Sequence, residues 1–121
     1  MSKNQNLENL MNDLENQPEN IPQFLKALLD AEVFCLAKKD ENNQIQFRLL
    51  ETEDGDKAIP FFLSLQTIHN DLGTEVEFLE LTTRELFETT KGSILVLNPT
   101  SDISKEFSPK EIQFLLEVGI S

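Results

Sequence analysis

The stretch Ile59–Ser64 reads IPFFLS and combines two structural signals. Its apolar residues, rich in phenylalanine, are typical of a strand, and Ser64 is a favoured N-cap residue for a following helix. Pro60 has no N–H to donate to a neighbouring strand, which predicts an edge strand or a bulge at this point. The sequence therefore predicts a strand over residues 58–63 that leads into a short helix closed by Gly73.

Two more strands are predicted before this stretch. Val33–Ala37 is an apolar run bounded by charged residues, as in a buried strand. Ile45–Leu49 alternates apolar with polar side chains, as in a half-exposed strand. Polar turns at residues 40–43 and 54–56 join the three strands, and this arrangement predicts an antiparallel meander.

The second half of the chain alternates strands with helices. Val76–Leu81 is typical of a strand, and Thr82 and Glu85 have the spacing of a capping box that opens a helix. Ile94–Leu97 is entirely apolar, which predicts a central strand. Ser108–Glu111 places an N-cap, a proline and a glutamate where a final helix would begin.

Two amphipathic helices are predicted at the start of the chain. Apolar residues recur at helical spacing over residues 4–16, and a second apolar stripe follows Pro22, which the first turn of a helix tolerates. The leader, residues 1–20, is expected to be semi-detached. It can pack on its own domain or on a second copy, so a homodimer is one open expectation.

These elements predict one α+β domain. A length of 121 residues is typical of a single domain, here residues 1–121. The expected order is ααβββαβαβα, with helices packed on a mixed sheet of about five strands.

Composition restricts the classes of partner. The net charge of −12 opposes binding to nucleic acids and to anionic membranes, because both are negatively charged. The nine phenylalanines, without any tryptophan or tyrosine, most simply fill a core. No signal peptide and no apolar run of about 18 residues is present, so a cytoplasmic location is expected.

The residues that usually carry chemistry are scarce. Cys35 is the only cysteine and His69 the only histidine, which excludes metal sites made of several such residues. Cys35 would be a nucleophile only if it were exposed beside a base, and His69 would act as a general base only in a suitable site. The acidic residues between Glu51 and Asp56 do not have the spacing of an EF-hand loop. We therefore predict no catalytic residue, no cofactor and no metal site.

Two segments are the candidates for a partner or ligand surface. A polar turn that begins with Asn98 and Pro99 follows the most apolar predicted strand, Ile94–Leu97. If this strand and the strand that contains Pro60 belong to one sheet, their ends would lie close together. The candidate surface consists of Pro60, Phe61, Phe62, Ser64, Asn98, Pro99 and Phe107. The alternative is that these residues only end strands and pack the core.

An ordered set of segments resembles the N-terminal domain of SseB, the enhanced-serine-sensitivity family of bacterial proteins. The segments cover nearly the whole chain and are Phe24–Leu29, Glu53–Gly55, Ile59–Leu65, Arg84–Glu88, Leu95–Pro99 and Lys105–Ile112. The family name comes from a growth phenotype on serine and implies no catalytic residues. Fuller members continue into a second domain, so the resemblance implies either a single-domain member or a shortened one.

Three functions are compatible with this sequence as hypotheses. The first is a non-catalytic module that binds another protein and is linked to the serine-sensitivity phenotype. The second is a sensor of a small ligand such as an amino acid, with hydrogen bonds from Asn98, Ser64 and Thr100. The third and most remote is an enzyme that uses Cys35 or His69.

Overall fold

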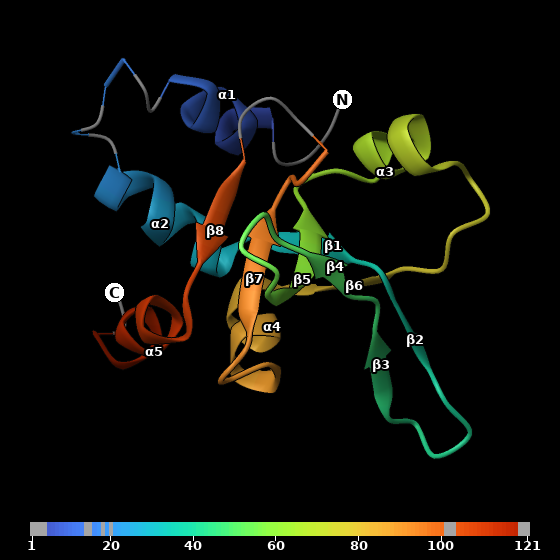
Figure 1. Ribbon diagram of the computed structural model, residues 1–121. Helices are drawn as coiled ribbons and strands as arrows, with labels where there is room; N and C mark the ends of the chain where they lie inside the picture. Colours follow the sequence, from blue (N-terminus) through green and yellow to red (C-terminus); the bar gives the residue numbers. More distant parts are fainter. Residues whose placement is uncertain (1–4, 14–15, 18, 20, 101–103, 119–121) are drawn as a thin grey trace.

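The computed structural model describes residues 5–13, 16–17, 19, 21–100 and 104–118 (Figure 1). The predictions for residues 1–4, 14–15, 18 and 20 lie outside the described residues, as does the side chain of Val118. The helices are α1 (Gln5–Asp13), α2 (Ile21–Asp30), α3 (Leu65–Leu72), α4 (Thr83–Thr89) and α5 (Pro109–Val118). The strands are β1 (Glu32–Cys35), β2 (Ala37–Lys39), β3 (Ile45–Phe47), β4 (Leu50–Glu51), β5 (Lys57–Phe62), β6 (Leu79–Thr82), β7 (Ile94–Leu97) and β8 (Lys105–Phe107).

A mixed sheet of six strands forms the centre of the molecule. Its order is β6-β1-β5-β7-β8, and β4 pairs with β5 beside this path. Only β5 and β7 pair in parallel, and the other pairs are antiparallel. The α+β class and the mixed sheet are confirmed. The short strand β8, in the segment before the last helix, was not predicted.

The predicted meander takes a different form in the structure. The segment Val33–Ala37 divides at Leu36, so β1 pairs directly with β5, whereas β2 pairs with β3 in a separate two-stranded sheet. Figure 1 shows this hairpin projecting from the body of the molecule. Gln46 and Arg48 are exposed in the hairpin, and a place between two central strands would have required burying them.

Pro60 lies in a central strand, so the prediction of an edge strand was wrong. The carbonyl of Phe61 accepts a hydrogen bond from the Asn98 N–H (2.8 Å), so the backbone of Phe61 faces β7. Pro60, one residue earlier, therefore faces the other side of β5. There β4 pairs with β5 up to Ala58 and β1 pairs with it only from Phe61. The missing N–H of proline thus falls where one partner strand has ended and the next has not begun.

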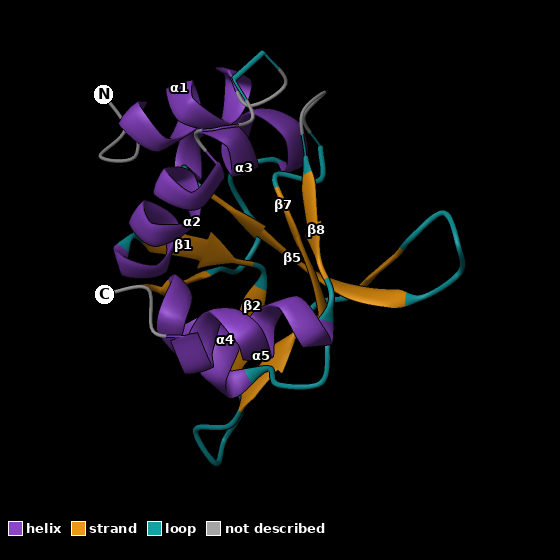
Figure 2. Cartoon of the chain, turned by 90° about the vertical axis from the view of Figure 1, so that its left-hand side faces the viewer, coloured by secondary structure: helices purple, strands orange, loops and turns teal. Residues whose placement is uncertain are grey.

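The central strands of the sheet, β5 and β7, are buried on both faces. Figure 2 shows α1, α2, α4 and α5 gathered on one side of the sheet. On that side a large core includes Phe61, whereas Phe62 belongs to a smaller cluster with Ile68 of α3. Because the consecutive residues Phe61 and Phe62 point to opposite faces of the sheet, α3 packs on the face opposite to the other four helices.

The leader helix α1 contributes to the main core. Leu7 and Met11 are buried in the same cluster as Phe24 of α2, so α1 packs on its own domain. None of the described helices is long and apolar enough to cross a membrane.

Predicted caps begin three of the helices. Ser64 accepts a hydrogen bond from the Thr67 N–H (3.2 Å) and begins α3. Thr82 and Glu85 form both bonds of a capping box at α4. Ser108 accepts from the Glu111 N–H (3.2 Å) at α5. Local sequence is sufficient to fix these starts because each cap involves residues three positions apart.

Candidate functional site

The two segments singled out from the sequence meet at the carboxyl ends of β5 and β7. Besides the bond between the Asn98 N–H and Phe61, the Asn98 side chain accepts a hydrogen bond from the Leu63 N–H (3.2 Å). Its amide also lies 3.8 Å from the Met11 sulfur of α1. Asn98 has a left-handed backbone (φ 51°), which asparagine tolerates better than most residues. Asn98 therefore joins two strands and the leader helix.

The same segments offer little to a partner, because most of their side chains are buried. Phe61, Phe62 and Phe107 are each 0% exposed, and Ser64 and Asn98 are 5% and 7% exposed. Pro60 is buried as well, and Pro99 is half-buried. These facts favour the alternative interpretation, strand ends and core packing.

The polar groups considered for ligand binding are already used within the protein. The hydroxyl of Ser64 lies 3.0 Å from that of Thr67 and also caps α3. The hydroxyl of Thr100 donates to the Asp71 carboxylate (2.6 Å). A ligand at this place would have to displace these bonds.

Cys35 and His69 lie in settings that suit structure rather than chemistry. Cys35 is 0% exposed, and its thiol points toward the Leu79 carbonyl (3.8 Å). Desolvation by burial raises the pKa of this thiol to about 11, so the reactive thiolate is scarce near neutral pH. His69 is half-buried in the last turn of α3, where its carbonyl accepts from the Gly73 N–H.

The buried thiol leads to a prediction for alkaline stability. Its pKa is raised from 9.0 to about 11, so the folded state holds the proton more tightly than the unfolded chain. The resulting stabilisation is complete below pH 9.0 and is lost as the pH rises toward about 11. Urea unfolding across this range should show a steeper loss of stability for the wild type than for Cys35→Ala. Parallel slopes for the two proteins would contradict the raised pKa.

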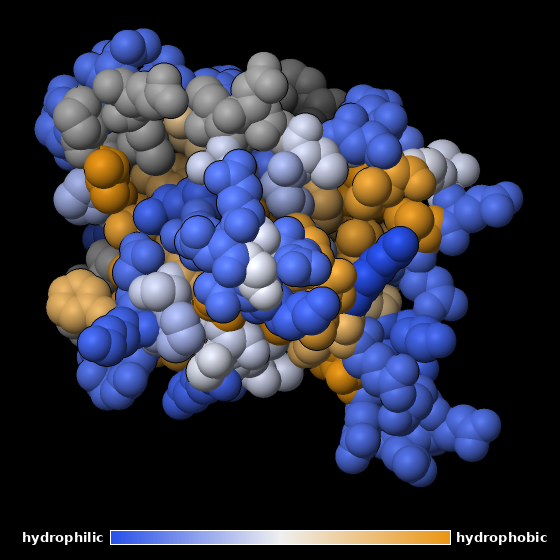
Figure 3. Space-filling model, viewed as in Figure 1, coloured by the Kyte–Doolittle hydropathy of each residue, from blue (hydrophilic) through white to orange (hydrophobic). Residues whose placement is uncertain are grey.

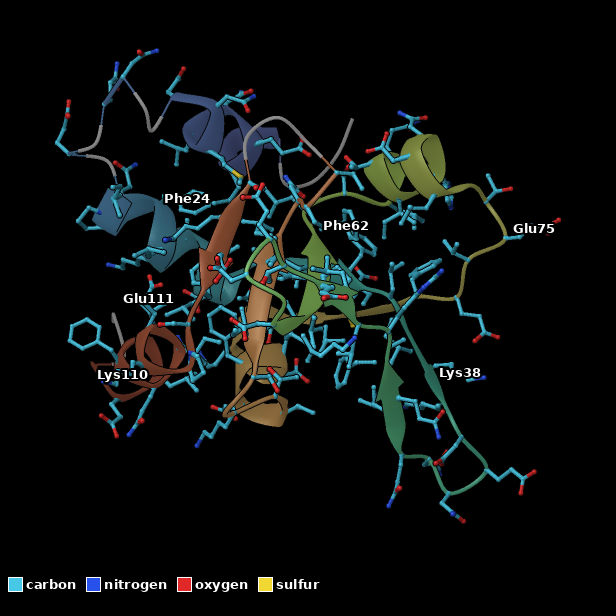
Figure 4. The ribbon with its side chains drawn as sticks, in the orientation of Figure 1. Phe24, Lys38, Phe62, Glu75, Lys110 and Glu111 are labelled. Atoms are coloured by element: carbon cyan, nitrogen blue, oxygen red, sulfur yellow. The ribbon has the colours of Figure 1, made fainter. Side chains whose placement is uncertain are left out.

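A cleft of about 460 Å³ opens between the projecting hairpin and the segment that leads into β6. We call it the hairpin cleft, and its lining residues are Leu36, Ala37, Lys38, Gln46, Phe47, Arg48, Glu75, Val76 and Glu77. Its volume lies within the range of about 300–1,000 Å³ that is common for binding sites. In Figure 4, Lys38 and Glu75 lie on opposite sides of this opening.

The walls of the hairpin cleft carry opposite charges. Lys38 and Arg48 come from the hairpin, and Glu75 and Glu77 come from the facing segment. All four side chains are exposed, and within the described part of the chain no ion pair joins them to one another. This site was not predictable from the sequence because three separate segments form it, and its one local signal was the alternation of residues 45–49.

The acidic turn lines a different cleft of about 420 Å³ beside β4. Glu51, Glu53, Asp54 and Glu106 contribute carboxylates to it. No group of three or more histidine, cysteine or acidic side chains in the described part of the chain is arranged to hold a metal ion. The turn therefore remains a solvated acidic surface.

Comparison with known proteins places the chain in a family. The model of the SseB protein N-terminal domain matches residues 7–113. The chain belongs to the SseB family. Protein SseB of Escherichia coli (strain K12) is 34% identical over 123 residues, which cover 96% of this chain and 48% of that protein. Protein SseB of Shigella flexneri gives the same figures.

The SseB chain described above spans about half the length of these curated relatives. No solved structure matches it. The match runs from within α1 to the middle of α5, so the hairpin cleft lies within the SseB domain itself.

Proposed function

We propose that this chain is a non-catalytic protein-interaction module, linked to the serine sensitivity for which its family is named, and that its partner contacts the hairpin cleft. The cleft itself carries the proposal, because it is open, carries charges of both signs and lies on a projecting hairpin. Cys35 and His69 offer no support for an enzyme, given the burial of the thiol and the place of the histidine at a helix end.

The composition of the cleft suits a protein partner. Phe47 and Val76 provide half-buried apolar surface, and Leu49, which follows the lining residue Arg48 in the chain, is 54% exposed. Protein interfaces commonly combine an apolar centre with a polar rim and are enriched in arginine and aromatic residues. Arg48 and Phe47 supply both of these here.

Capture from a native bacterial lysate tests the proposal. The wild-type chain should retain a stoichiometric protein, and the double variant Arg48→Glu with Leu49→Ala should retain about tenfold less, because it removes a rim charge and an exposed apolar side chain. Lys110→Glu is the matched control, since Lys110 is an exposed lysine on α5, away from the cleft (Figure 4). Equal capture by all three proteins would rule out the hairpin cleft as the contact surface.

A small ligand with both a carboxylate and an ammonium group is the second candidate occupant, because the two walls have opposite charges. Such a ligand at 100 times its dissociation constant would stabilise the fold by about 2.7 kcal/mol. If amino acids stabilise the wild type in a thermal-shift screen, but not the Arg48→Glu variant, the ligand-sensing function replaces the protein-binding one.

A further inference from the structure

We infer that the outer edge of β2 accepts an extended acidic peptide as an added strand. This inference rests on the proposed protein-binding function and specifies the chemistry of the partner. Strand addition is a common mode of peptide recognition, in which backbone hydrogen bonds provide affinity and side chains provide specificity.

The hydrogen bonds of the hairpin show which backbone groups face the outer edge. The carbonyl of Leu36 accepts from the Arg48 N–H (2.8 Å), and the Asp40 N–H donates to the Gln44 carbonyl (2.9 Å). Residues 36 and 40 therefore face β3. Since successive strand residues face opposite edges, the backbone groups of Ala37 and Lys39 point to the outer edge.

No other strand among the described residues pairs with that edge. β2 pairs with β3 alone, and the ladder between β1 and β6 ends at Cys35 and Leu79. The chain before Leu79 turns away from β2 and forms the far wall of the hairpin cleft. Figure 1 shows no helix or strand beside the outer edge of β2, and Figure 3 shows the tip of the hairpin as a hydrophilic projection.

The charges on the hairpin indicate an acidic occupant. Lys38 and Lys39 are consecutive and exposed on β2, and Arg48 follows β3. Lysine on an edge strand deters indiscriminate pairing, and the same charges favour a strand with carboxylates opposite them. Toward the base of the hairpin, Ala37 is only 5% exposed and Glu77 lies nearby, so the accessible part of the outer edge is centred on Lys39.

A second copy of this chain is a poor occupant of the edge. Two β2 strands paired in antiparallel fashion would bring their lysines together across the new ladder. Like charges directly opposite each other destabilise a strand pair. The edge therefore selects a different, acidic segment.

Titration with a fluorescein-labelled decapeptide that alternates valine with glutamate tests the inference. Fluorescence anisotropy should show binding that weakens as salt is added, whereas the same peptide with glutamine for glutamate should bind more weakly and without that salt dependence. The double variant Lys38→Glu with Lys39→Glu should bind about tenfold more weakly, and Lys110→Glu should bind like the wild type. Amide NMR shifts should centre on Lys39 and its neighbours in β2.

Lys39→Pro separates strand addition from simple charge attraction. Proline removes an N–H that faces outward and so leaves the ladder between β2 and β3 intact, which the NMR signals of the hairpin would verify. Peptide binding should be lost in this variant. Binding that survives Lys39→Pro, or binding of the glutamine peptide as strong as that of the glutamate peptide, would overturn the inference.

Two further outcomes keep the two proposals distinct. If the double variant Arg48→Glu with Leu49→Ala loses capture of a lysate protein whereas Lys39→Pro retains it, strand addition is wrong and the protein-binding function stands. If light scattering shows a dimer that Lys39→Pro abolishes, the edge pairs with a second copy and the acidic peptide is excluded.

Discussion

Replacing Phe61 with alanine should lower the free energy of unfolding by about 3–5 kcal/mol, among the largest losses expected for any single change in the core. Phe61 is 0% exposed. Its ring centroid lies 6.1 Å from those of both Phe87 and Phe107, and the Phe87 and Phe107 centroids are 5.4 Å apart. Three rings from β5, α4 and β8 thus share one volume, and alanine would leave a cavity among them.

Phe114→Ala is the matched control for this prediction. Phe114 lies on α5 and is 62% exposed, so its removal should change the free energy of unfolding by no more than about 0.5 kcal/mol. Urea unfolding of the wild type and the two variants would measure both effects. Similar losses for Phe61→Ala and Phe114→Ala would contradict the packing described for β5, because they would mean that the central rings add no more than a surface one.

The parts of the fold that depend on neighbours in sequence were predictable. Thr82 with Glu85, and Ser108 with Glu111, mark helix starts because the bonding groups are three residues apart. Ile94–Leu97 was correctly placed as a central strand, since an all-apolar strand needs cover on both faces. The short β8 escaped prediction because its three residues, Lys105–Phe107, give no period to recognise.

The parts that depend on distant segments were not predictable. Pro60 fits in a central strand only because β4 stops pairing with β5 before this residue and β1 begins to pair after it, and β1 is distant in sequence. The hairpin cleft likewise requires β2, β3 and residues 75–77 to be placed in space. Local patterns carry no information on such placement.

At the candidate surface, the two predicted segments come together as expected, but most of their side chains are buried. The sequence indicated that Phe62 and Asn98 would approach each other if their strands shared a sheet, and they do lie at the ends of the neighbouring strands β5 and β7. A sheet with one open face would have exposed one of the two consecutive rings. Because α3 packs on the face of Phe62, both rings are buried, and the open surface lies instead at the hairpin.

Replacing Asn98 with alanine should lower the free energy of unfolding by about 2–4 kcal/mol. Losing a buried hydrogen bond typically costs about 1–3 kcal/mol, and the Asn98 side chain accepts one from the Leu63 N–H. Alanine in a left-handed conformation adds about 1 kcal/mol or more, and Asn98 has φ 51°. Asn98→Gly should cost less than Asn98→Ala, because glycine keeps this backbone conformation without strain.

Asn43→Ala separates the two contributions at Asn98. Asn43 also has a positive φ, 62°, but it is exposed in the hairpin turn, so alanine there introduces the strain without removing a buried bond. Thermal and urea unfolding of the three variants should rank the losses as Asn98→Ala, then Asn98→Gly, with Asn43→Ala near the cost of the strain alone. If Asn98→Ala and Asn43→Ala cost the same, the bond to Leu63 adds no stability, and the junction of β5 and β7 must depend on packing alone.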